Sequence, residues 1–73
     1  MISKKYIKEL GFVNMQDFFD YVVESKINGN YRQTKEFIQK MNKEQQLEFK
    51  DYMKYMGFEQ EIQDELINII MEV

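Results

Sequence analysis

Apolar residues recur every three to four positions along five segments of this chain, and glycine or asparagine separates each segment from the next. Such spacing places the apolar side chains on one face of an α-helix. The pattern predicts helices at about residues 3–10, 15–27, 31–41, 43–56 and 60–72. The strongest stripe belongs to the second helix and comprises Met15, Phe18, Phe19, Val22 and Val23. The predicted inner residues of the first helix are Ile2, Tyr6, Ile7 and Leu10, and those of the third are Tyr31, Phe37, Ile38 and Met41. The fourth helix contributes Phe49, Tyr52, Met53 and Met56, and the last contributes Ile62, Leu66, Ile69, Ile70 and Val73.

The ends of these helices carry recognisable stop and start residues. Gly11, Gly29 and Gly57 each follow a helical stretch, where a residue in the left-handed region commonly ends a helix, so we expect a positive φ at all three. Asn14 is placed to cap the second helix. Asn30 and Asn42 are placed to cap the next two, with Gln33 and Gln45 at the capping-box offset. The chain therefore reads as all-α: a compact bundle of four to five short helices in one domain, residues 1–73.

One segment nearly occurs twice. Residues 6–23 and 52–70 align with one inserted residue, and both contain a helix end, a Gly-Phe pair and a new helix. The likeness fits either a duplicated helix–Gly-Phe–helix unit or two uses of the same capping chemistry. A solenoid is not expected, because about three repeats are needed for stability.

Composition removes several kinds of chemistry. The 73 residues contain no cysteine and no histidine, so disulfides, ordinary zinc sites and serine–histidine catalysis are not expected. Carboxylates pair at Asp17 and Asp20, and again on the last helix, but such pairs on exposed helices are usually solvated. No EF-hand, phosphate loop or nucleophile motif is present. We therefore expect a protein that is not an enzyme and needs no cofactor or metal.

Charge is distributed unevenly along the chain. The formal net charge is −3, yet residues 57–73 hold five acids and no base, whereas residues 26–43 hold five bases and Glu36 alone. This is either a solvated surface or a dipole that faces a partner. No signal peptide and no apolar run long enough to span a membrane is visible, so we expect a cytoplasmic protein without a membrane partner.

Some apolar residues fall outside the predicted stripes and suggest a protein interface. Leu47 lies opposite the stripe of the fourth helix and Tyr55 lies off its edge, while Ile67 and Met71 share another side of the last helix. We hypothesise that these four residues contact a protein partner or a second copy, with the acids Glu61, Asp64 and Glu65 steering a basic partner. The alternative is that packing on two sides buries them, or that single exposed apolar residues carry no function.

Nucleic-acid binding is a second hypothesis. The third helix offers Arg32, Gln33, Lys35 and Lys40 as phosphate-binding or base-reading residues. An acidic chain with an acidic last helix lacks the basic face that phosphate contacts require, which disfavours this hypothesis.

Residues 27–53 resemble a pattern found in small phage-encoded helical proteins of unassigned function. Ile27, Asn28, Gly29, Gln33, Phe37, Ile38, Phe49 and Tyr52 carry the likeness. The resemblance implies a phage or mobile-element accessory protein that binds and modulates a host protein, located in the host cytoplasm. It implies no catalytic residue. The sequence thus favours a protein-binding module, with a small DNA-binding domain or a structural subunit of a larger assembly as the alternatives.

Overall fold

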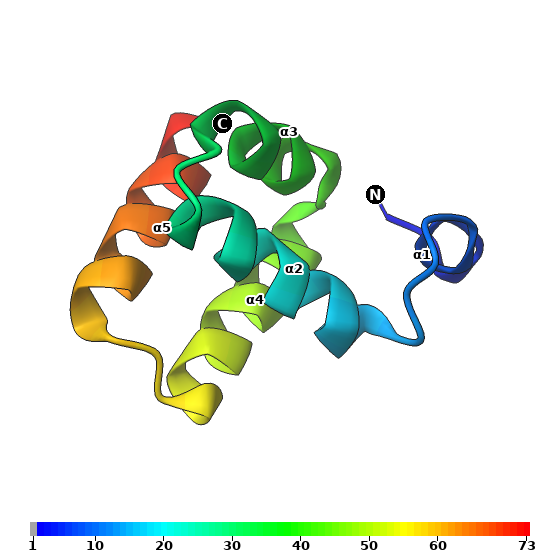
Figure 1. The fold of residues 1–73 in the computed structure, drawn as a ribbon, viewed down its shortest axis with the longest axis horizontal. Coiled ribbons are helices and arrows are strands. Elements are labelled where there is room, and N and C mark those ends of the chain that lie inside the picture. Colours follow the sequence, from blue (N-terminus) through cyan, green and yellow to red (C-terminus); the bar gives the residue numbers. More distant parts are fainter. Residues whose placement is uncertain (1) are drawn as a thin grey trace.

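The computed structural model describes residues 2–73 and consists of short helices joined by tight turns (Figure 1). The elements are α1 (Lys4–Glu9), α2 (Met15–Ile27), α3 (Tyr31–Lys40), α4 (Lys43–Met56) and α5 (Gln60–Glu72). No strand is present among these residues. The predicted all-α bundle is confirmed, and the observed helix ends lie within one residue of the predicted ends.

The second helix, α2, is the centre of the packing. It contacts each of the other four helices, and α5 packs against α2, α3 and α4. The short helix α1 lies at one end of the long axis of the molecule and α5 lies at the other (Figure 1). The molecule is therefore built as a four-helix body with α1 attached to the start of α2.

The buried core draws apolar residues from every helix. Phe18, Val22, Ile38, Phe49, Met53 and Leu66 are fully buried. Aromatic rings connect the helices, since Phe18 packs edge-on against Phe37 and Phe19 lies 5.1 Å from Phe49 between ring centroids. Burial of this apolar surface is the main stabilising contribution to a domain of this size.

The predicted glycine stops are present. Gly11, Gly29 and Gly57 have φ values of 89°, 81° and 70°. At the end of α4, the Gly57 amide donates to the Lys54 carbonyl and the Phe58 amide donates to the Met53 carbonyl, which is the Schellman arrangement. An alanine would be strained at Gly57, because only glycine adopts this left-handed conformation at no steric cost.

The near-repeat is structurally similar at the helix stop but not at the following helix start. The end of α1 shows the same two hydrogen bonds, from Gly11 to Lys8 and from Phe12 to Ile7. The next helix then begins differently in the two copies: Asn14 accepts the amide of Asp17, whereas Glu59 makes no side-chain cap. The shared feature is therefore the Gly-Phe stop.

The asparagine caps are also confirmed. Asn30 accepts the Gln33 amide, and Asn42 accepts the Gln45 amide. Only the Asn42 site forms a reciprocal capping box, in which Gln45 accepts from the Asn42 backbone amide. At Asn30 the Gln33 side chain instead accepts from the Asn30 side chain, so this box is incomplete.

Four residues that the sequence places on inner faces are exposed instead: Leu10, Tyr31, Met56 and Val73. Each stands at a helix end or directly after one. Instead of packing in the core, Tyr31 donates its hydroxyl hydrogen to the Glu72 carboxylate at the surface.

Candidate protein-binding surface

On α4, the two residues predicted to face a partner are exposed. The exposed fraction is 59% for Leu47 and 86% for Tyr55. Asp51 lies between them at four-residue spacing, so the three side chains form one row along the helix. This row runs along the solvent-exposed side of α4.

On α5, the two predicted residues behave differently. Met71 is 76% exposed, but Ile67 is half-buried and packs against the core. The placement of Ile67 on an open face was therefore wrong. The physical reason is that α5 is covered by α2, α3 and α4 together, which buries a wider arc than a single stripe.

The predicted steering acids are partly engaged within the molecule. Glu65 forms an ion pair with Lys26 at 2.8 Å, and Asp64 accepts a hydrogen bond from the Gln60 side-chain amide at 2.8 Å. Glu61 is exposed. Because α5 packs against α2 and α3, the acidic end of the sequence lies beside lysines of its basic stretch. This placement reduces the charge asymmetry seen along the chain.

The polar residues of α3 that could read DNA also contact the protein itself. The side-chain amide of Gln33 donates to the Tyr21 hydroxyl at 3.4 Å. Lys40 donates to the Tyr6 hydroxyl at 2.8 Å, and its ammonium lies 5.2 Å from the centroid of that ring.

Lys35 contacts Glu72 at 3.8 Å, and Glu72 also accepts the hydrogen bond that raises the pKa of Tyr31. Arg32 is exposed. Three of the four predicted nucleic-acid residues are thus in contact with neighbouring helices.

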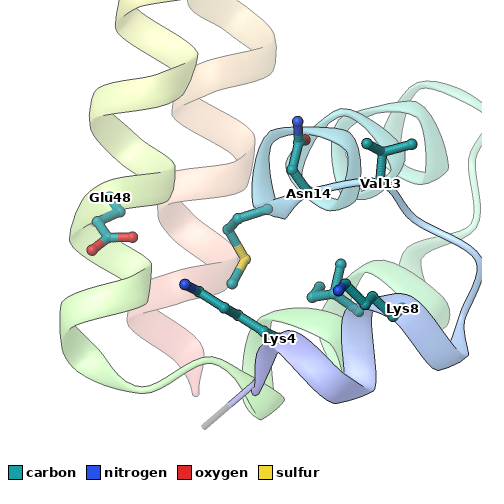
Figure 2. Close-up of a pocket in the computed structure, with 7 residues that line it drawn as sticks. Lys4, Lys8, Val13, Asn14 and Glu48 are labelled. Atoms are coloured by element: carbon teal, nitrogen blue, oxygen red, sulfur yellow. The ribbon is translucent and has the colours of Figure 1, made fainter.

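A groove that the sequence did not predict lies between α1, the start of α2 and α4 (Figure 2). It has a volume of about 380 Å³ and is lined by Lys4, Ile7, Lys8, Val13, Asn14, Met15 and Glu48. Val13 stands in the turn before α2 and is 78% exposed. An apolar residue between a glycine stop and an asparagine cap was the one local signal for this site.

A second hollow continues the groove along α4. It shares Met15 and Glu48 with the first, has a volume of about 390 Å³, and is further lined by Gln16, Phe19, Asp51, Tyr52 and Tyr55. We call the two hollows together the α1/α4 groove. Val13 and Tyr55 belong to its two parts, whereas Leu47 and Met71 do not line it.

The side of the groove formed by α1 is held in place by Gln45. Its amide oxygen accepts from the Ile2 backbone amide at 3.0 Å, and its amide nitrogen donates to the Ile2 carbonyl at 2.6 Å. The same oxygen completes the capping box at Asn42. A residue in the first turn of α4 therefore also fixes the chain segment that leads into α1.

The floor beneath Tyr55 is fixed by a polar contact between α4 and α2. The Tyr52 hydroxyl donates to the Asp20 carboxylate at 2.6 Å. Burial, together with this bond and the negative charge of Asp20, raises the pKa of Tyr52 to about 12. Tyr52 is thus neutral at physiological pH, and its side chain forms part of the floor of the second hollow.

Within residues 2–73, no group of three or more acidic, histidine or cysteine side chains is arranged to hold a metal ion. None of the helices in that range is long and apolar enough to cross a membrane. No protein-family model, curated protein or solved structure matches the chain significantly.

Proposed function

We propose that this chain is a non-enzymatic helical module that binds another protein through the α1/α4 groove. The observation that carries the proposal is the pair of highly exposed apolar side chains, Val13 and Tyr55, on a groove with an apolar floor. Apolar surface gathered in a concave site is characteristic of interaction surfaces, and tyrosine is enriched where binding energy concentrates.

Two further observations favour a protein over a nucleic acid. Three of the four α3 side chains that could contact nucleic acid are engaged with Tyr6, Tyr21 or Glu72, and Arg32 is the exception. The net charge of −3 opposes the approach of a phosphate backbone. The resemblance to small phage-encoded proteins extends the proposal: the partner would be a host protein, and binding would act by steric occlusion.

The proposal can be tested by affinity capture from host lysate with three forms of the chain. The wild type is compared with Val13→Glu, which places a charge in the groove, and with Met71→Glu. Met71 is a matched control because it is exposed to a similar degree but lies outside the groove.

We expect a protein that the wild type and Met71→Glu capture and Val13→Glu does not. Equal capture by all three forms would contradict the use of this groove. Loss of capture in Met71→Glu alone would move the interface to the outer face of α5. Equal melting temperatures of the three forms would show that the differences arise from the surface.

A further inference from the structure

We infer that the partner presents an amphipathic helix with acidic residues along one flank and basic residues along the other, a proposal that rests on the protein-binding function above. The acidic flank would face α1 and the basic flank would face α4. The charges on the two sides of the groove, and the way its apolar floor is enclosed, lead to this inference.

The two sides of the groove carry opposite charges. Lys4 and Lys8 are four residues apart on α1, and both line the groove. Glu48 and Asp51 are three residues apart on α4: Glu48 lines the first hollow together with the α1 lysines, and Asp51 lines the second hollow, whose other wall is the start of α2. Side chains at these spacings share a helix face, so each side presents two like charges to an occupant.

These four charges are not paired with one another. Among residues 2–73, ion pairs within 4.0 Å join Lys26 to Glu65 and Lys35 to Glu72. Figure 2 shows the Lys4 side chain reaching from α1 toward the side on which Glu48 stands. An occupant with a matching charge on each flank would meet both sides favourably and would be oriented by them.

The floor of the groove suits the apolar face of a helix. Ile7 and Phe19 are buried beneath it, Met15 is partly buried, and methionine adapts readily to the shape of an apolar partner. A helix satisfies its own backbone hydrogen bonds. A peptide that binds by strand addition would need a strand edge, and residues 2–73 contain no strand.

A second copy of the chain fits this arrangement less well. The exposed face of α5 carries Glu61 and Asp64 and could approach Lys4 and Lys8. The lysines that lie beside this face, Lys26 and Lys35, are already paired with Glu65 and Glu72, so the same face would bring mainly acids toward Glu48 and Asp51. Like charges at close approach disfavour binding, and we therefore assign the groove to a different protein.

The test uses three display libraries of short helical peptides. In every library the apolar face is randomised among Leu, Ile, Met and Phe. The flanks are Glu on one side and Lys on the other in the mixed library, Glu on both sides in the second, and Lys on both sides in the third. The affinities of the best binders from each library are then measured by fluorescence anisotropy.

We expect the best mixed-flank peptide to bind at least about tenfold more tightly than the best peptide of either other library. The comparison with the Lys-flanked library is the stricter one, because the negative net charge of the chain would by itself favour Lys flanks. Lys4→Glu with Lys8→Glu should shift the preference to Lys flanks, and Glu48→Lys with Asp51→Lys should shift it to Glu flanks.

Lys43→Glu with Lys54→Glu is the matched control. It changes the net charge as much as the α1 variant does, at exposed residues that do not line the groove. It should leave the mixed-flank preference in place. If this control shifts the flank preference as much as the α1 variant does, net charge alone determines which peptide flanks bind best, and the inference is overturned.

Other results are also decisive. If a peptide with like flanks binds as tightly as the mixed-flank peptide and Val13→Glu abolishes the binding of both, the inference is wrong and the proposed function stands.

If no peptide binds the groove while lysate capture still depends on Val13, the occupant is not such a helix. Self-association abolished by Val13→Glu, measured by analytical ultracentrifugation, would assign the groove to a second copy. If the Val13→Glu variant captures the same protein from lysate as the wild type does, the proposed function itself is refuted.

Discussion

The Gln45→Ala substitution should loosen α1 and weaken the groove while leaving the four-helix body folded. The Gln45 side chain forms three hydrogen bonds, two with the Ile2 backbone and one with the Asn42 amide. Each contributes about 0.5–1.5 kcal/mol net. Because Gln45 is only half-buried, water can replace part of the loss, and we expect a destabilisation of about 1–3 kcal/mol.

Thermal unfolding followed by circular dichroism measures the overall effect. A loss of 1 kcal/mol lowers the melting temperature of such a small domain by roughly 4–8 °C. Amide hydrogen exchange locates it: the amides of Ile7 and Leu10, bonded within α1, should exchange faster relative to those of α2 and α4. The control is Gln39→Ala, which removes an exposed glutamine beside Ile2.

Unchanged exchange in α1 of the Gln45→Ala variant would refute this reasoning. It would mean that the packing of Ile2 and Ile7 alone holds α1 in place. An equal effect of Gln39→Ala would show that the measurement does not report on the hydrogen bonds of Gln45.

Four other outcomes follow from the contacts described. Gly57→Ala should destabilise the domain by about 1 kcal/mol or more in chemical unfolding, because alanine resists the positive φ at this helix stop. Ile67→Asp should lower the melting temperature strongly, whereas Leu47→Asp should leave it nearly unchanged, since Ile67 packs on the core and Leu47 is exposed. The stability advantage of the wild type over Tyr52→Phe should be complete below pH 10 and decline as the pH rises toward 12. The reason is that folding raises the pKa of Tyr52 from 10.0 to about 12 and so favours its neutral form. An electrophoretic shift assay with random duplex DNA should show no binding tighter than about micromolar at physiological salt, given the acidic balance of the chain.

The helices could be predicted from the sequence because their ends depend on local chemistry. The amide of Gly57 and the side chain of Asn42 make their bonds within a few residues, so the stops and caps can be identified without knowledge of the tertiary fold. The inner faces were correct along the middle of each helix. They were wrong at termini such as Tyr31 and Met56, where exposure depends on how far a neighbouring helix extends.

The groove could not be predicted, because it depends on where α1 lies relative to α4. That placement involves contacts between residues far apart in the chain, such as the two hydrogen bonds between Ile2 and Gln45, which are 43 positions apart. Periodicity describes each helix by itself and does not indicate that Val13 and Tyr55 line one concave surface. For the same reason, the partial burial of Ile67 on α5, a helix that packs against three others, was not visible in the stripe of α5 alone.

Chemical-shift mapping of the isotope-labelled chain with its captured partner tests the central claim most directly. The amides of α1, of the turn around Val13 and of the Glu48–Tyr55 stretch of α4 should shift on addition of the partner, while those on the exposed face of α5 should not. Shifts concentrated on α5 around Met71, or on α3 around Arg32, with the groove unaffected, would contradict binding through the α1/α4 groove.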